Sequence, residues 1–261
     1  MQAHEIQSKF ETTFKSLCGN NHPLDVWREF VVMAAIAISN QCDLRERQVR
    51  EAEYMALIKP YENSDKRFMF SELLALAASN FIHNGPTLDF FGEVYMRLGI
   101  SNSATGQFFT PMSITRMMGR LTVNSPTNQT ELERKGFLSV CDPAVGAGAC
   151  LLGALEGLQE QKIPVEKVYM EGWDIDRTAA LMAYIQLSLC NVAAKIVHGN
   201  SLSCEVYSVW YTPAYILGGW SRKLKNAALN MDSKEVGSLQ PQPKPNKLVG
   251  MEAIRARLYA Q

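Results

Sequence analysis

The residues that decide the fold are Asp142-Pro143-Ala144-Val145-Gly146-Ala147-Gly148-Ala149. The apolar run before them, residues 136–141, predicts a buried strand, and the apolar run after them, residues 150–155, predicts the start of a helix. A strand that ends on a carboxylate and turns through glycines into a helix is typical of a site for a nucleotide-like cofactor, because glycine lets the backbone approach a ligand closely. The stretch lacks the third glycine of the dinucleotide fingerprint and the Gly-Lys-Ser/Thr of the P-loop. Pyrophosphate binding is therefore the weaker interpretation.

A second predicted strand, residues 167–173, ends at Asp174. An acidic side chain at this point can accept hydrogen bonds from both hydroxyls of a ribose. The next residue, Ile175, is apolar and free to pack on a base.

A helical stretch, residues 177–193, leads to a third predicted strand, residues 194–198. Asn200 and Leu202 follow that strand, and both suit the rim of a base pocket. Taken singly, each carboxylate has a simpler explanation, as a helix cap or as a solvated strand end. The agreement of three successive strand ends favours a nucleoside-shaped cofactor without a diphosphate.

Four segments carry a family resemblance, in the order GQFFTP (106–111), DPAVGAGA (142–149), GWDID (172–176) and HGNSL (198–202). This order resembles the adenine-specific N6 DNA methyltransferases that are similar to the modification subunit of type I restriction-modification systems. The segment LDFFGEVYMRL (88–98) also resembles the helix that those proteins carry before GQFFTP. The joint occurrence of GQFFTP and DPAVGAGA makes the resemblance specific.

The resemblance implies S-adenosylmethionine as the cofactor. The residues that would hold it are, for the methionine end, Phe108, Phe109, Thr110, Pro111, Asp142, Ala144, Gly146 and Gly148, for the ribose, Asp174, and for the adenine ring, Ile175, Asn200 and Leu202. Asn200 stands where the family usually has Asp. Its side-chain oxygen can still accept a hydrogen bond from the exocyclic amine of the cofactor.

The family's catalytic tetrapeptide, Asn/Asp-Pro-Pro-Phe/Tyr, corresponds here to Thr212-Pro213-Ala214-Tyr215. By the resemblance, Tyr215 would stack on a target adenine flipped out of the duplex, and the carbonyl of Pro213 would accept a hydrogen bond from the adenine amino group. Thr212 offers only a hydroxyl in place of the carbonyl-type acceptor, and Ala214 lacks the stiffness of the second proline. A misplacement of the attacking atom by about 1 Å can lower the rate roughly a hundredfold.

Three functions follow from these observations. The leading one is a site-specific DNA methyltransferase that uses S-adenosylmethionine and acts on adenine N6. The second, favoured by Thr212 and Ala214, is a catalytically impaired subunit or regulator that binds the cofactor without methyl transfer. The third is an N-methyltransferase that acts on protein or RNA, and the GQFFTP segment argues against it.

We expect an α/β fold whose Rossmann-like, class I methyltransferase sheet is truncated to four parallel strands in the order 3-2-1-4. The fourth strand, residues 205–211, would be an open edge that a partner chain or self-association could cover. The predicted domains are a helical N-terminal region at residues 1–100, a methyltransferase-like domain at residues 101–225, and a linker with a short C-terminal helix at residues 226–261.

The charge balance does not favour strong DNA binding. Lys+Arg and Asp+Glu are equal at 26 each, so no net charge attracts the chain to phosphate. Two clusters of basic residues could contact DNA locally: Arg116 with Arg120, and Arg222 with Lys223 and Lys225. The alternative is that each cluster is only the solvated face of a helix. We therefore expect DNA binding that is weak or needs a partner chain, such as a specificity subunit.

No apolar run reaches the roughly 18 residues that a membrane helix needs, and residues 1–20 carry no signal-peptide pattern. A cytoplasmic location is the prediction. The 6 cysteines form no C-x-x-C pair and the 4 histidines are scattered, which predicts reduced thiols and no metal site.

Overall fold

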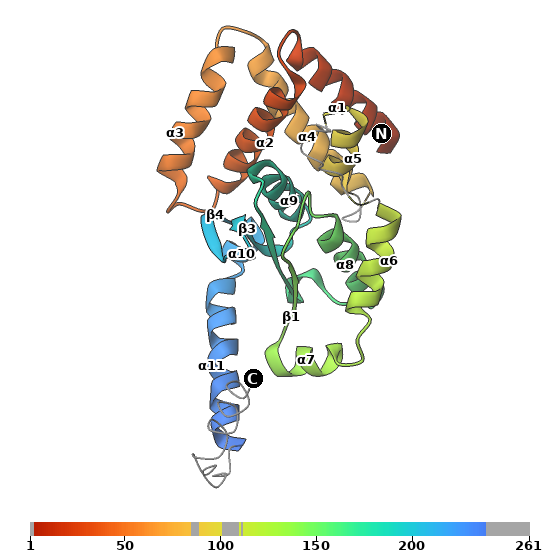
Figure 1. The fold of residues 1–261 in the computed structure, drawn as a ribbon, viewed down its shortest axis with the longest axis vertical. Coiled ribbons are helices and arrows are strands. Elements are labelled where there is room, and N and C mark those ends of the chain that lie inside the picture. Colours follow the sequence, from red (N-terminus) through yellow and green to blue (C-terminus); the bar gives the residue numbers. More distant parts are fainter. Residues whose placement is uncertain (1–2, 85–88, 101–109, 111, 239–261) are drawn as a thin grey trace, which may run out of the picture. The chain divides into compact units, whose positions relative to one another are not determined.

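The computed structural model describes residues 3–84, 89–100, 110 and 112–238. The chain divides into two units, Met1–Ser221 and Arg222–Gln261. The first unit holds a four-stranded sheet among helices (Figure 1). Its elements are α1 (Ala3–Cys18), α2 (Pro23–Ser39), α3 (Arg47–Ile58), a 3-10 turn (Lys59–Tyr61), α4 (Lys66–Asn84), α5 (Phe90–Arg97), α6 (Met112–Val123), α7 (Asn128–Lys135), β1 (Leu138–Asp142), α8 (Ala149–Glu160), a second 3-10 turn (Val165–Lys167), β2 (Val168–Asp174), α9 (Arg177–Leu189), β3 (Ala193–Asn200), β4 (Glu205–Tyr211), α10 (Pro213–Leu217) and the start of α11 (Trp220–Ser238).

The sheet is open and has the strand order β1-β2-β3-β4. β1, β2 and β3 are parallel, and the register sets Asp142 beside Gly172 and Asp174 beside His198. β4 runs antiparallel to β3. The predicted α/β class is confirmed, but the predicted order 3-2-1-4 and the parallel fourth strand are wrong. Only residues 201–204 connect β3 to β4, whereas a parallel crossover needs a dozen residues or more, so the chain returns as a hairpin.

β4 is an edge strand, as predicted, but its neighbour is β3, and β1 forms the other edge. The side chain of Arg50 covers part of β4. Its Nη2 donates to the carbonyl of Val209 at 2.9 Å, and its guanidinium carbon lies 3.9 Å from the ring centroid of Trp210. This contact gives a backbone carbonyl of the edge strand a partner, which protects the edge from wrong pairing.

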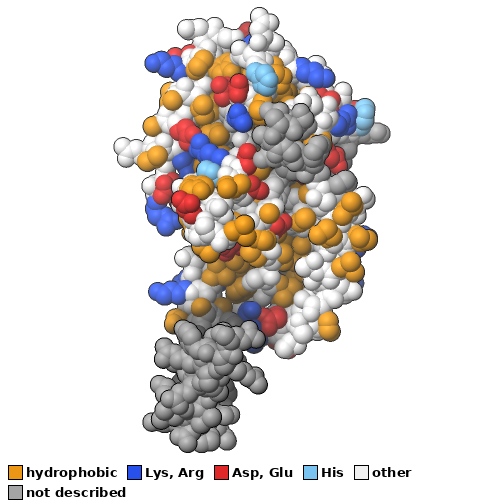
Figure 2. Space-filling view, in the orientation of Figure 1, with side chains coloured by type: hydrophobic (Ala, Val, Ile, Leu, Met, Phe, Trp, Pro, Cys, Tyr) orange, Lys and Arg blue, Asp and Glu red, His pale blue; other side chains and the backbone are white. Residues whose placement is uncertain are grey.

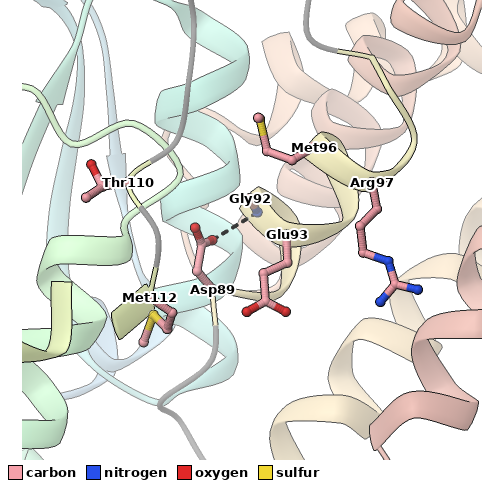
Figure 3. A pocket seen from close by; sticks show the side chains of 7 residues that line it. All are labelled: Asp89, Gly92, Glu93, Met96, Arg97, Thr110 and Met112. Carbon is pink, nitrogen blue, oxygen red and sulfur yellow. Dashed lines mark hydrogen bonds between the residues drawn. The ribbon is translucent and has the colours of Figure 1, made fainter. Parts of the chain in front are cut away.

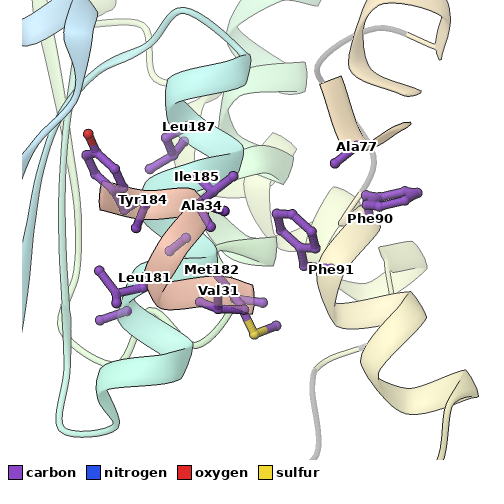
Figure 4. Packing of buried hydrophobic residues seen from close by; sticks show 14 of the residues in the cluster. Val31, Ala34, Ala77, Phe90, Phe91, Leu181, Met182, Tyr184, Ile185 and Leu187 are labelled. Atoms are coloured by element: carbon purple, nitrogen blue, oxygen red, sulfur yellow. The ribbon is translucent and has the colours of Figure 1, made fainter. Parts of the chain in front are cut away.

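The N-terminal helices share one hydrophobic core with the sheet. α9 is buried along most of its length and contacts both β3 and α2. Figure 4 shows Val31 of α2 near Leu181 and Met182 of α9. α1 lies in the predicted helical N-terminal region and adds four fully buried side chains at helical spacing: Ile6, Phe10, Phe14 and Leu17. The predicted boundary at residue 100 lies inside the first unit, and the domain limits stay predictions.

α6 and α8 pack at glycines. A Cβ added to Gly119 would lie 2.2 Å from the carbonyl carbon of Gly153, and one added to Gly153 would lie 2.4 Å from the carbonyl oxygen of Thr115. One turn later, a Cβ added to Gly157 would lie 2.8 Å from the Cγ2 methyl of Val123 and 3.3 Å from Cα of Arg120. The two backbones therefore touch and run in the same direction, which sets the start of α6 near the start of α8.

The second unit begins within α11, which continues to Ser238. The prediction of a linker is therefore wrong for residues 226–238. The first proline of the tail is Pro241, and Ala, Leu, Lys and Met before it are good helix formers. The predicted short helix near the C-terminus lies outside the described residues.

In the described part of the chain, no helix combines the length and the apolar character needed to span a lipid bilayer.

Candidate functional site

The carboxyl ends of β1, β2 and β3 meet at one edge of the sheet, and the residues that end these strands are Asp142, Asp174 and Asn200. In an open parallel sheet, ligands bind beyond this edge. The structure thus brings together three residues that the sequence selected as ligands of one cofactor.

The loop after β1 is held against β2. Asp142 Oδ1 accepts a hydrogen bond from the Ala144 N–H at 3.0 Å, and the Val145 N–H donates to the carbonyl of Trp173 at 2.7 Å. The carboxylate of Asp142 therefore shapes the turn that its own strand enters.

Two glycines complete this loop. Gly146 has a φ of 55° and Gly148 a φ of 102°, values that residues with a side chain rarely adopt. A Cβ on Gly148 would also lie 3.3 Å from Cα and Cβ of Ala183 in α9. Gly148 caps α8, whose first-turn N–H groups have no partner inside the helix. Gly148 is buried against α9 and Gly146 is half-buried, so the loop makes a tight turn at the edge of the sheet.

Asp174 joins the end of β2 to the glycine loop. Its Oδ2 accepts a hydrogen bond from the Gly146 N–H at 2.8 Å, and its Oδ1 accepts one from the Asp176 N–H at 2.8 Å. Burial raises the pKa of the Asp174 carboxyl, the two N–H groups act against this shift, and the charges of Asp176 and Asp142 add to it. Each oxygen keeps a second lone pair, so the carboxylate can still accept hydrogen bonds from two hydroxyls.

Two apolar side chains stand exposed at the same edge. Ile175 is 64% exposed and Leu202 is 96% exposed. Asn200 Oδ1 accepts hydrogen bonds from the N–H groups of Leu202 at 3.0 Å and Ser203 at 3.3 Å. The oxygen that we predicted to accept from an adenine amine therefore already stabilises the turn that presents Leu202.

A pocket of about 380 Å³ opens between α5 and the start of α6. Figure 3 shows the residues that line it, which are Asp89, Gly92, Glu93, Met96, Arg97, Thr110 and Met112. Thr110 is the one residue of the predicted FFTP segment that the structure describes; Phe108, Phe109 and Pro111 lie outside the described residues.

Asp89 connects this pocket to the glycine loop. Gln186 Nε2 donates to Asp89 Oδ1 at 2.8 Å and to the carbonyl of Ala147 at 2.7 Å. Burial raises the pKa of the Cys150 thiol at the start of α8, and the charges of Asp142 and Asp89 raise it further. Both carboxylates therefore lie close to the first turn of α8.

The sequence prediction missed Asp89. The signal that could have found it is an Asp before an apolar helical run, which is typical of a helix N-cap. Its partner Gln186 lies in a helix that reads as plain core, so the link to the glycine loop has no sequence signal.

The structure does not bring Thr212, Pro213 and Tyr215 to the edge of the sheet that holds Asp142 and Asp174. Because β4 is antiparallel, it ends with Tyr211 beside Lys195, near the amino end of β3. The prediction that these three residues follow a strand at the carboxyl edge is wrong.

Contacts on the amino side of the sheet hold these residues in place. Thr212 is fully buried, and its Oγ1 donates to the carbonyl of Val192 at 2.7 Å and accepts from the Ala194 N–H at 2.8 Å. The ring of Tyr215 lies 6.1 Å from that of Tyr169, near the start of β2. A rise of about 3.3 Å per residue sets Tyr169, and with it Tyr215, about 16 Å from Asp174.

The predicted basic cluster on α6 is neutralised by acids of α8. Arg116 Nε donates to Glu156 Oε2 at 2.8 Å, and Arg120 pairs with Glu160. On the face shown in Figure 2, Lys and Arg side chains lie among Asp and Glu side chains rather than in one basic patch. The other cluster, Arg222 with Lys223 and Lys225, lies on α11. Within the described ranges, no group of three His, Cys, Asp or Glu residues is arranged to hold a metal ion.

The sequence matches a protein family, and the chain is similar to a solved structure. A family model with the description N-6 DNA Methylase matches residues 87–241. Among solved structures, the methyltransferase subunit of a type I restriction-modification system from Streptococcus thermophilus is similar, at 13% identity and a TM-score of 0.33, over 73% of this chain and 56% of that subunit. The chain thus spans about half the length of that subunit. No curated protein matches the sequence.

Proposed function

Because this chain belongs to the N-6 DNA methylase family, we propose that it binds S-adenosylmethionine at the carboxyl edge of its sheet and contributes this site to an enzyme that methylates N6 of adenine in DNA. The observation that carries the proposal is the joint placement of Asp142, the glycine loop and Asp174 at one edge, tied by the hydrogen bond from Gly146 to Asp174.

The residues at this edge fit the parts of the cofactor. Asp174 keeps lone pairs for the two ribose hydroxyls. The exposed side chains of Ile175 and Leu202 suit the two faces of an adenine ring, since each removes apolar surface from water when a ring packs on it. The glycine turn at Gly146 and Gly148, with the first-turn N–H groups of α8 that have no partner inside the helix, suits the methionine end and its carboxylate.

When bound, S-adenosylmethionine supplies a methyl group on a sulfonium, and the acceptor must be held in line with it. An adenine amino group is a poor nucleophile, so the protein has to hold the flipped base and accept its amino hydrogens. Tyr215 lies about 16 Å from Asp174 at a rise of about 3.3 Å per residue, and Thr212 is bonded to the amino end of β3. We therefore propose that the acceptor-binding groups come from residues outside the described fold or from a partner chain. DNA and a specificity subunit are the proposed partners.

A second candidate function has an observation in its favour. The hydroxyl of Thr212 donates to the carbonyl of Val192 and accepts from the Ala194 N–H, so this hydroxyl is not available to act on a base. The chain would then be a subunit or regulator that binds the cofactor without methyl transfer.

Two measurements test the proposal in order. Calorimetric titration of the purified chain with S-adenosylmethionine should give saturable binding, and Asp174→Ala should abolish most of it. Transfer of a labelled methyl group to unmethylated DNA, with and without a companion specificity subunit, then separates the two candidates. Binding without transfer in either condition supports the second one, and an absence of binding by the wild-type chain refutes both.

A further inference from the structure

Asp89 is a buried carboxylate in the wall of the pocket between α5 and α6. Only 3% of the residue's surface is exposed to solvent. No Lys, Arg or His of the described residues forms an ion pair with it. Arg97 lines the same pocket but pairs with Glu11 at 3.0 Å, and Figure 3 shows its side chain directed away from Asp89. A buried charge of this kind costs free energy unless something compensates it.

The two oxygens of Asp89 have different surroundings. Oδ1 accepts hydrogen bonds from the Gly92 N–H at 2.9 Å and from Gln186 Nε2 at 2.8 Å. No hydrogen bond from the described residues reaches Oδ2, and Figure 3 shows that oxygen directed into the pocket. A Cβ on Gly92 would lie 2.0 Å from Oδ2, so glycine at this position leaves the room that the oxygen occupies.

Helix capping alone does not explain this arrangement. Asp89 caps α5 through Oδ1, and Asn caps helices about as well as Asp without a buried charge. The buried charge, and an oxygen that no described residue reaches with a hydrogen bond, therefore point to a ligand that carries a positive group.

The walls of the pocket narrow the class of that ligand. Glu93 adds a second negative charge at the rim, Thr110 adds a hydroxyl, and Met96 and Met112 supply apolar, polarisable surface. This combination suits a primary ammonium group on a short aliphatic stem, which donates up to three hydrogen bonds to oxygen acceptors.

We propose that Asp89 binds the α-ammonium group of the methionine part of S-adenosylmethionine. The inference rests on the proposed function, since it assigns a residue to one end of the same cofactor. The position of Asp89 suits this role, because it lies near the glycine loop. Gln186 Nε2 donates to Asp89 Oδ1 at 2.8 Å and to the carbonyl of Ala147 in that loop at 2.7 Å. The pocket between α5 and α6 thereby becomes the methionine end of a site whose adenosine end is at Asp174.

The test compares two ligands that differ only in the amino group. S-adenosylhomocysteine carries it, and S-adenosyl-4-thiobutyrate is the same molecule without it. Calorimetry on the wild-type chain, Asp89→Asn and Asp89→Ser gives a double-mutant cycle between one side chain and one ligand group. Ser also caps a helix, so each variant keeps the start of α5. Glu166→Gln removes an exposed negative charge before β2 and is the charge control.

The wild-type chain should bind S-adenosylhomocysteine roughly 10- to 100-fold more tightly than the desamino analogue, the range expected for a buried charge-assisted hydrogen bond. Asp89→Asn and Asp89→Ser should lose that preference while binding the desamino analogue as the wild type does, and Glu166→Gln should keep it. Equal affinity of the wild-type chain for both ligands overturns the inference and leaves the proposed function intact. Binding of neither ligand by the wild-type chain overturns both.

Discussion

Replacement of Asp174 by alanine tests the geometry of the cofactor edge. The carboxylate accepts two backbone hydrogen bonds, from Gly146 and Asp176, each at 2.8 Å. A hydrogen bond to a charged group contributes about 1.5–3 kcal/mol, so the loss of both would lower the free energy of unfolding by roughly 3–6 kcal/mol. Burial of the carboxylate, which raises its pKa, opposes this contribution. We expect a net loss of about 2–4 kcal/mol.

The assay is thermal and urea denaturation at pH 7. In a unit of this size, 1 kcal/mol shifts the melting temperature by about 2–4 °C, so Asp174→Ala should melt about 5–15 °C below the wild type. Asp174→Asn keeps one acceptor oxygen, so its melting temperature should lie between those of Asp174→Ala and the wild type. Glu166→Ala, an exposed acid before the same strand, should melt within about 2 °C of the wild type. The reasoning is refuted if Asp174→Ala melts with the wild type and binds S-adenosylmethionine with unchanged affinity.

Three further predictions follow from single positions. Gly148→Ala places a Cβ at a residue with a φ of 102°, 3.3 Å from Ala183. Urea denaturation should show a free energy of unfolding that is lower by about 1–2 kcal/mol, and cofactor binding should weaken. An unchanged denaturation curve contradicts this prediction. Thr212→Val leaves the Ala194 N–H without its partner and should lower the free energy of unfolding by about 1–3 kcal/mol, while calorimetry finds S-adenosylmethionine affinity unchanged; a lost affinity with an intact fold would return Thr212 to the cofactor site. Burial raises the pKa of Asp89 above the ordinary 3.8, so its ionised form destabilises the ligand-free fold at neutral pH. Asp89→Asn should then equal or exceed the wild type in stability at pH 7, and the difference should shrink as pH falls through the raised pKa toward about 4; a difference that grows on acidification contradicts this sign.

The placement of Asp142 and Asp174 at one edge of the sheet could be predicted, because it depends on patterns in consecutive residues. Asp142 and Asp174 each end an apolar strand, and the register of a parallel sheet then sets them at one edge. The glycine turn also needs no distant partner, because positive φ values are a property of the residue itself.

The parts that the sequence did not predict depend on contacts between distant segments. Asp89, Gln186 and Ala147 form one hydrogen-bonded chain although Asp89 and Gln186 are 97 positions apart. From the sequence, Arg116 and Arg120 are candidates for a basic patch. In the structure, each forms an ion pair with a glutamate of α8. No sequence pattern within α6 or α8 indicates that the arginines of α6 will pair with the glutamates of α8.

The error about Thr212 has a different origin, since the sequence held enough information to avoid it. Four residues lie between Asn200 and Glu205, and such a connection can close only an antiparallel hairpin. A strand that leaves the carboxyl edge by a hairpin must end at the amino edge, so the residues after Tyr211 lie at the opposite edge from Asp142 and Asp174. Short connection length therefore outweighs motif resemblance at this point. If the proposed cofactor binds at Asp142 and Asp174, the groups that hold a target base have to reach this edge from residues other than Thr212 and Tyr215.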